Sequence, residues 1–254
     1  MSNIRLIARL DVKAPDLIKG VHLEGWRKLG NPREFAERYY ETGIDEILYL
    51  DAVASLYRRN TIVDLVRETA ENVFIPITVG GGIRSVEDAH TLLRAGADKI
   101  AVNTAAVKRP DLIRELAERF GSQCIVLSIQ AKRNDNGTWE AMCDLGREHS
   151  GRDALEWARQ GAELGAGEIL VTSIDKEGTR RGFDVDLTQS VSAAVNIPTI
   201  ASGGMGGFDH MQAVISKGGA DAVAIAYMLH RDETTVGQLK EQALAAGIEV
   251  RPVG

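Results

Sequence analysis

The chain has 254 residues, of which 44% are apolar and 26% charged, and its formal net charge is −6. This length suits one large domain or two small ones, and the composition allows a sizeable core with a solvated surface. Both charge signs are interspersed along the chain, which argues against a nucleic-acid groove. No apolar run approaches the roughly 18 residues that a membrane span needs, and the N-terminus lacks the apolar core of a signal peptide. Cys124 and Cys143 form no metal or disulfide pattern, so we expect a reduced, cytoplasmic protein.

Eight short apolar segments alternate with eight longer segments of helical periodicity. The short segments are rich in Ile, Val and Leu, as parallel strands covered on both faces are. The predicted strands span residues 4–10, 46–51, 75–79, 99–103, 124–129, 168–172, 199–202 and 222–225. The predicted helices span residues 31–43, 60–72, 85–95, 110–120, 151–165, 184–195, 207–218 and 233–246. Asn31-Pro32 and Ser85 are typical helix starts, and Gly96 and Gly165 are typical helix ends.

This alternation predicts an α/β fold, a single (β/α)8 TIM barrel domain over residues 1–254. Barrels of this kind take about 250 residues. The rival architecture is a doubly wound open sheet, which predicts a glycine-rich turn after the first strand. Residues 11–15 contain no glycine, and this favours the barrel.

The two halves of the chain resemble each other. Three pairs match in order, namely Gly82 with Gly204, Asn103 with Ala226, and Asp11 with Gln130. Their offsets are 204 − 82 = 122, 226 − 103 = 123 and 130 − 11 = 119 residues. Three ordered pairs at nearly one offset predict two fused half-barrels of four βα units each.

The repeat places glycine-rich turns after opposite strands of the barrel. Ser202-Gly203-Gly204 follows the seventh predicted strand and Ala226 follows the eighth, while Gly80-Gly81-Gly82 and Asn103-Thr104 follow the third and fourth. Backbone N–H groups at such turns bind phosphate, and glycine lets the anion approach closely. The pattern therefore predicts two phosphate sites that face each other across the barrel mouth, and an elongated substrate with a phosphate at each end. The alternative is that these glycines only make tight turns.

Several polar residues lie where a barrel presents its catalytic groups, at the C-terminal strand ends. Asp11 ends the first strand, with Gln130 as its repeat partner on the opposite side, and Asp51 ends the second. Lys19 supplies positive charge, and Glu177 lies in the loop after the sixth strand. Asp11 is a candidate general acid or base. No cluster has metal-ligand spacing, so we expect neither a metal nor a cofactor.

Taken together, these residues resemble the cyclase subunit of imidazole glycerol phosphate synthase, the HisF family, over nearly the whole chain. The motifs that carry the resemblance are Leu10-Asp11-Val12-Lys13, Thr78-Val79-Gly80-Gly81-Gly82-Ile83-Arg84, Asn103-Thr104-Ala105-Ala106-Val107, Phe120-Gly121-Ser122-Gln123, Gly165-Ala166-Gly167-Glu168-Ile169-Leu170 and Ile200-Ala201-Ser202-Gly203-Gly204. The resemblance implies that ammonia from a separate glutaminase subunit, docked on the N-terminal barrel face, travels through the barrel. It implies that ammonia attacks a phosphoribulosyl-formimino aminoimidazole carboxamide ribotide, so that an imidazole ring closes and AICAR is released.

The resemblance also assigns roles to individual residues. Asp11 matches the catalytic acid on the first strand, and Lys19 matches a lysine on a mobile loop. The residues that match the first phosphate site are Gly82, Asn103 and Thr104, and those that match the second are Gly178, Ser202, Gly204 and Ala226. The residues that match a charged ring gating the ammonia channel are Arg5, Glu46, Lys99 and Glu168. A surface salt-bridge network is the alternative for these four charges.

The chain departs from the family pattern at its catalytic centre. The second catalytic carboxylate belongs where Gln130 stands, and an amide cannot act as general acid or base, although it can orient a substrate. Arg9 replaces a cysteine, and its strand parity with Asp11 points it inward, where it would lower the pKa of Asp11 or bind an extra anion. Glu177 replaces an aspartate.

These departures leave three functions open. The first is a working cyclase of histidine biosynthesis. The second is a paralogue that relays ammonia to a different acceptor, for example a sugar precursor. The third is the related ribotide isomerase, against which Gln130 also counts, because that enzyme needs a second aspartate. A purely structural protein is disfavoured, since it has no use for two phosphate sites.

Overall fold

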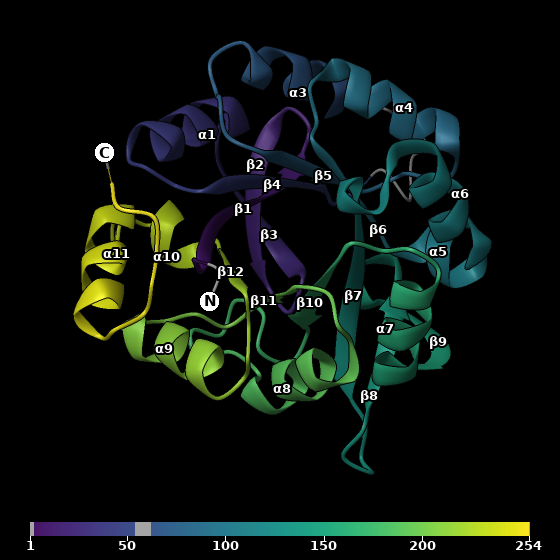
Figure 1. Ribbon diagram of the computed structural model, residues 1–254. Helices are drawn as coiled ribbons and strands as arrows, with labels where there is room; N and C mark the ends of the chain where they lie inside the picture. The colour runs from purple at the N-terminus through teal and green to yellow at the C-terminus, as the bar shows by residue number, and fades with distance from the viewer. Residues whose placement is uncertain (1–2, 54–61, 254) are drawn as a thin grey trace.

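The computed structural model describes residues 3–53 and 62–253 and contains a closed barrel of eight parallel strands. In ring order these are β1 (Arg5–Lys13), β4 (Glu46–Asp51), β5 (Ile77–Gly80), β6 (Lys99–Val102), β7 (Ile125–Arg133), β10 (Glu168–Ser173), β11 (Thr199–Ser202) and β12 (Ala222–Ile225). Each strand pairs in parallel with the next, and β12 pairs with β1 to close the ring. Figure 1 shows the barrel from one end, with helices around it. The predicted TIM barrel is confirmed.

Within residues 3–53 and 62–253, eight helices cover the outside of the barrel, one after each barrel strand. They are α1 (Pro32–Glu41), α3 (Ile62–Ala70), α4 (Val86–Ala95), α6 (Asp111–Phe120), α7 (Ala154–Glu163), α8 (Val185–Ala194), α9 (Phe208–Ser216) and α11 (Val236–Ala245). The capping signals act as expected: the side chains of Asn31 and Ser85 accept backbone N–H groups, and Gly96 is left-handed at φ 117°. Residues 60 and 61 of the second predicted helix lie outside the described residues.

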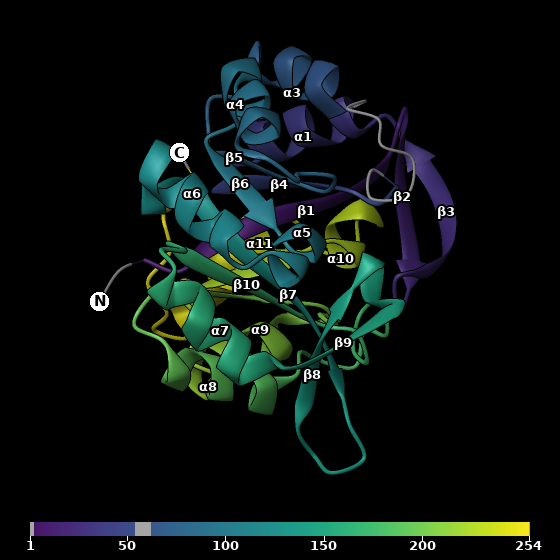
Figure 2. The ribbon, with the colours of Figure 1, turned by 90° about the vertical axis from the view of Figure 1, so that its right-hand side faces the viewer.

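Two β-hairpins extend beyond the barrel, and neither was predicted. β2 (Asp16–Val21) and β3 (Glu24–Gly30) follow β1, while β8 (Trp139–Cys143) and β9 (Glu148–Asp153) follow β7. In the side view of Figure 2 both hairpins project from the side opposite the N-terminus. The helix expected to begin at residue 151 begins instead at Ala154, because the Asp153 side chain caps it.

The hairpins and two short helices occur at equivalent places in the two halves and so support the internal repeat. α5 (Thr104–Lys108) follows β6, and α10 (Tyr227–His230) follows β12 at the equivalent place in the second half. The strand registers agree as well, since Ile7 lies opposite Glu46 and Val126 lies opposite Glu168. Each half is therefore a strand with a hairpin, followed by three further βα units.

The barrel interior is arranged in layers along its axis. An apolar layer is formed by Ile7, Leu48, Ala101, Val126, Leu170, Ile200, Ala222 and Ala224. Because side chains two positions apart point to the same face of a strand, Arg5 lies below Ile7 in this interior and Arg9 above it. A much larger apolar core lies between the barrel and its helices.

Candidate active site at the C-terminal mouth of the barrel

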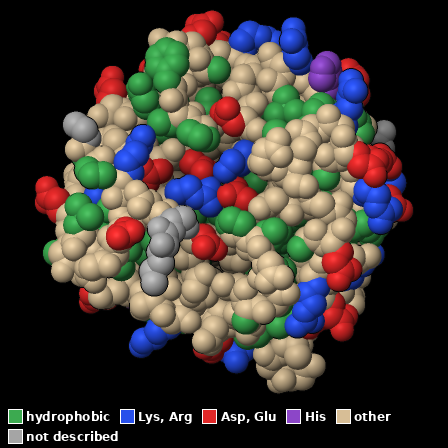
Figure 3. All heavy atoms as spheres, viewed as in Figure 1, with side chains coloured by type: hydrophobic (Ala, Val, Ile, Leu, Met, Phe, Trp, Pro, Cys, Tyr) green, Lys and Arg blue, Asp and Glu red, His purple; other side chains and the backbone are tan. Residues whose placement is uncertain are grey.

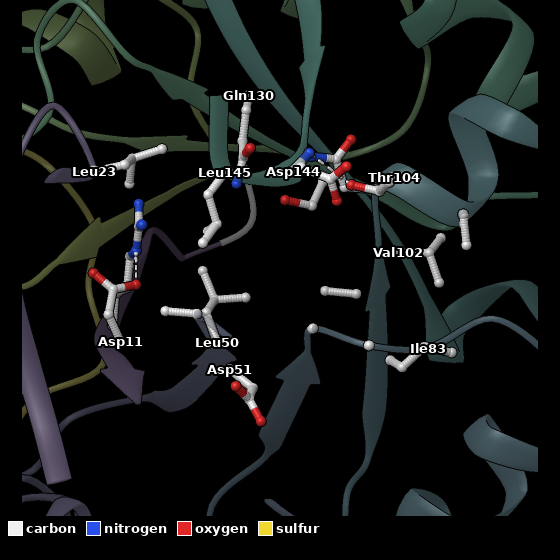
Figure 4. A pocket seen from close by; sticks show the side chains of 18 of the residues that line it. Asp11, Leu23, Leu50, Asp51, Ile83, Val102, Thr104, Gln130, Asp144 and Leu145 are labelled. Atoms are coloured by element: carbon white, nitrogen blue, oxygen red, sulfur yellow. Dashed lines mark hydrogen bonds and ion pairs between the residues drawn. The ribbon is translucent and has the colours of Figure 1, made fainter. Parts of the chain in front are cut away.

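A cavity of about 440 Å³ opens at the C-terminal ends of the barrel strands. It brings together residues that the sequence singled out from both halves, namely Asp11, Lys19, Asp51, Gly82, Asn103, Thr104, Gln130 and Glu177. In Figure 4, Asp11 lies on one side of this cavity and Thr104 on the other, with Leu50 between them. Hereafter this cavity is called the mouth pocket.

A second, smaller hollow lies beside the mouth pocket. Its lining includes all four residues matched to the second phosphate site, namely Gly178, Ser202, Gly204 and Ala226. Gly203 and Gly204 adopt left-handed φ angles of 93° and 105°, which turn the chain sharply after β11. Hereafter this hollow is called the second cup, and the turn at Gly82, Asn103 and Thr104 is called the first cup. Three charged side chains, Arg9, Lys19 and Glu177, line both the mouth pocket and the second cup.

Asp11 belongs to a buried network of charges. The Arg9 guanidinium donates through Nε to Asp11 Oδ1 at 2.9 Å, and the Lys19 ammonium lies 3.6 Å from Asp11 Oδ2. Glu177 accepts a hydrogen bond from Lys19 and a longer one, 3.4 Å, from Arg9 Nη1. Burial by itself would raise the pKa of Asp11, but the charges of Arg9 and Lys19 outweigh it and hold that pKa below its ordinary value. Asp11 is therefore an anion at neutral pH. This agrees with the prediction from sequence that an inward Arg9 lowers the pKa of Asp11.

The first hairpin carries Lys19 into this network. Its turn is held by the loop after β10, where the His22 amide donates to the Glu177 carbonyl at 2.9 Å. Gly178 adopts a left-handed φ of 72°, and a Cβ there would lie 2.5 Å from the Gly20 carbonyl oxygen. The hairpin thus packs on a glycine that admits no side chain. Lys19 is consequently 7% exposed despite its position outside the barrel.

At the opposite end of the barrel, four charges form a closed ring. Arg5 contacts Glu46 at 2.6 Å and Glu168 at 2.7 Å, and Lys99 contacts the same two carboxylates at 3.1 and 2.9 Å. The glutamates are 4% and 8% exposed, so these ion pairs are not a surface network. Figure 3 shows acidic and basic side chains gathered at the centre of the face seen along the barrel.

Comparison with known proteins decides the family. The model for the family described as "Histidine biosynthesis protein" matches residues 5–235. An imidazole glycerol phosphate synthase subunit HisF from Legionella pneumophila is 67% identical over 206 residues, which cover 81% of this chain and 97% of the relative. Proteins of the same name from Mycobacteroides abscessus and a Synechococcus species are 51% and 50% identical, over 97% and 99% of this chain and 98% and 100% of theirs. The chain belongs to the HisF family.

In this member of the HisF family, the side chain of Gln130 is buried. It is 8% exposed, and within residues 3–53 and 62–253 its Oε1 has no hydrogen-bond partner. Gln130 lines the mouth pocket (Figure 4), but this oxygen atom itself is buried. The side-chain amide of Gln130 can orient a substrate by hydrogen bonding, although it cannot act as a general acid or base.

The second hairpin contributes residues that the sequence did not single out. Asp144 and Leu145 line the mouth pocket, and both are left-handed without being glycine, at φ 44° and 60°. The Asp144 amide donates to Thr104 Oγ1 at 2.9 Å, and Asn103 Nδ2 donates to the Met142 carbonyl at 3.3 Å. The first cup is therefore tied to this hairpin by its own side chains.

No described helix is both long and apolar enough to cross a membrane. Among the described residues, no group of three or more His, Cys, Asp or Glu side chains is arranged to hold a metal ion.

Proposed function

We propose that the chain is the cyclase subunit of an imidazole glycerol phosphate synthase. It would use ammonia from a glutaminase subunit on phosphoribulosyl-formimino aminoimidazole carboxamide ribotide, to give imidazole glycerol phosphate and AICAR. The observation that carries this proposal is the placement of Asp11 on the wall of one pocket between two glycine-built cups. The names of the relatives, all HisF subunits of imidazole glycerol phosphate synthase, support it.

The two cups suit a substrate with two phosphates. The first lies where β5 and β6 end, and the second where β11 and β12 end, which are opposite positions in the eight-stranded ring. Backbone N–H groups at such turns attract anions. A net charge of −6 would repel a phosphorylated substrate in general, so local donors and the cations Arg9 and Lys19 must provide the attraction.

The interior layers suit the passage of ammonia. A neutral ammonia molecule crosses an apolar layer at small cost, whereas an ammonium ion loses its hydration there. The layer around Ile7 and Leu170 would therefore favour ammonia over ammonium. The closed ring of Arg5, Glu46, Lys99 and Glu168 lies at the entrance and must part for ammonia to enter. The glutaminase would dock on this N-terminal face.

The catalytic groups suit proton transfer by one carboxylate. Asp11 is ionised, so it serves first as a base that accepts a proton from the attacking nitrogen. Lys19 is the neighbouring ammonium and stabilises negative charge as it develops on the substrate. Gln130 lines the same pocket and would orient the substrate by hydrogen bonding through its amide.

A second candidate function is favoured by one observation, the amide at position 130. A paralogue that passes ammonia to a different acceptor, such as a sugar precursor, would keep the ring and the apolar layer while losing one proton-transfer group. Such a protein would deliver ammonia and show little or no cyclase activity.

The test is turnover of the ribotide with excess ammonium salt, which bypasses the glutaminase. We expect imidazole glycerol phosphate and AICAR in equal amounts, and their loss in Asp11→Asn. A wild-type chain that binds the ribotide without forming either product would exclude the cyclase and favour the ammonia relay.

A further inference from the structure

Arg9 connects two parts of the site that are separate in the sequence. Its guanidinium donates through Nε to Asp11 Oδ1 at 2.9 Å and through Nη1 to Ser202 Oγ at 2.9 Å. Asp11 lies in the mouth pocket, whereas Ser202 ends β11 and opens the second cup. One rigid, planar group therefore contacts both the candidate base and the phosphate site.

Arg9 is buried, so its guanidinium cannot replace these hydrogen bonds with bonds to water. The side chain is 2% exposed, and the apolar layer lies beneath it. Its longer contacts are Thr172 and Glu177, each at 3.4 Å from Nη1. A buried guanidinium cannot exchange a lost partner for water, so any change in one contact is passed to the others.

We propose that Arg9 is a positioning residue through which Asp11 and an oxyanion in the second cup compete for the same guanidinium. An oxyanion beside Ser202 draws Nη1 toward the cup, and the planar fork then moves Nε away from Asp11. Conversely, an Asp11 side chain without charge holds Arg9 less firmly and leaves it to the oxyanion. Such coupling is reciprocal, because each partner changes the affinity of Arg9 for the other by the same factor. This inference rests on the proposed second phosphate site, but it requires no turnover.

The experiment is a titration with inorganic phosphate, followed by amide NMR of the labelled chain. The amides of Gly203 and Gly204 report the second cup, and those of Gly82 and Thr104 report the first, so the two sites are separated. We expect Asp11→Asn to tighten phosphate binding at the second cup by about 5-fold or more. The same substitution in an Arg9→Met chain should change that affinity less than about 2-fold.

The matched control is Asp144→Asn. It removes a carboxylate that lines the same mouth pocket and forms an ion pair with Lys108 at 3.7 Å. We expect it to leave phosphate affinity at the second cup within about 2-fold of wild type, because the described hydrogen bonds of Arg9 do not involve Asp144. If Arg9→Met does not fold, Arg9→Lys replaces it, because a lysine keeps the charge but not the two-sided fork.

Equal tightening by Asp11→Asn with and without Arg9 would overturn the proposal, since the effect would then be direct charge repulsion. No tightening in either chain would overturn it too. Absence of phosphate binding at the second cup would overturn both this inference and that phosphate site. If the ribotide is turned over while the coupling is absent, the cyclase proposal stands and only the role of Arg9 is lost.

Discussion

Asp11 and Gln130 occupy equivalent positions in the two halves of the barrel: Asp11 lies opposite Leu50 in the β1–β4 ladder, and Gln130 lies opposite Thr172 in the β7–β10 ladder. Their strands face each other across the eight-stranded ring. One half of this near-symmetric pair is a carboxylate held as an anion by Arg9 and Lys19. The other is an amide with a free acceptor.

Loss of Lys99 should uncouple the two sources of ammonia. Lys99→Met opens the ring and leaves Glu46 and Glu168 with fewer partners, which we expect to cost about 3 kcal/mol of unfolding free energy. Turnover with glutamine and the glutaminase should fall several-fold relative to turnover with ammonium salt. The ratio of the two rates and a urea titration measure these effects.

The control for the ring is Arg67→Met. This residue forms an exposed pair with Asp64 on α3, and such pairs contribute at most about 1 kcal/mol. An unchanged ratio of the two rates in Lys99→Met would contradict the gating role of the ring.

Gly178→Ala should release the first hairpin. The added Cβ would lie 2.5 Å from the Gly20 carbonyl oxygen and 2.9 Å from the Val21 Cα atom. We expect Lys19 to leave Asp11 and Glu177, turnover to fall by about 10-fold or more, and trypsin to cut the hairpin faster.

Gly137→Ala is the matched control for backbone strain. Its φ of 87° imposes a similar left-handed penalty, but a Cβ there meets nothing within 4 Å. Equal losses of turnover in the two variants would show that hairpin docking on Gly178 does not position Lys19.

His230 should make the fold sensitive to acid. Burial, with the charge of Lys19 adding to it, lowers the pKa of His230 from 6.5 to about 3. The His230 imidazole therefore becomes protonated near pH 6.5 in the unfolded chain but only near pH 3 in the folded chain. The free energy of unfolding is consequently at its full value above pH 6.5 and decreases as the pH falls toward 3. Between pH 7 and pH 5 we expect a loss of about 2 kcal/mol.

The measurement is the unfolding free energy of wild type and His230→Gln at both pH values. The variant should lose less stability between them, although it is less stable at pH 7 because the 2.7 Å contact with the Tyr39 hydroxyl is changed. His90→Gln, on the exposed surface of α4, is the control. Parallel pH dependences of wild type and His230→Gln would exclude this role.

The barrel, its repeat and the inward direction of Arg9 were predictable from sequence, because strand periodicity and repeat spacing are local signals. The hairpins were harder. The turn of the first is made by His22 and Leu23 at φ 51° and 63°, where the usual signal is glycine or asparagine. An Asn136-Gly137 signal does lie just before the second hairpin, in the turn between β7 and β8, and it could have revealed that β8 follows β7 as an antiparallel strand.

The partners of Arg9 could not be predicted beyond Asp11. Strand parity gives the direction of a side chain, but the contact with Ser202 depends on how β11 packs across the barrel interior. The position of Asp144 in the mouth pocket could not be predicted for a similar reason. It depends on the unpredicted second hairpin and on the hydrogen bond from the Asp144 backbone amide to Thr104.

The most direct test compares wild type with Gln130→Asp in turnover of the ribotide with excess ammonium salt. A correctly placed general acid or base contributes about 10²- to 10⁴-fold. We predict measurable wild-type turnover that depends on Asp11, and a sharp increase, at least about 10-fold, when the second carboxylate is restored. Gln130→Asn, which keeps the amide, should give no increase. Bound ribotide with no turnover in either wild type or Gln130→Asp would contradict the cyclase and indicate another acceptor for the ammonia.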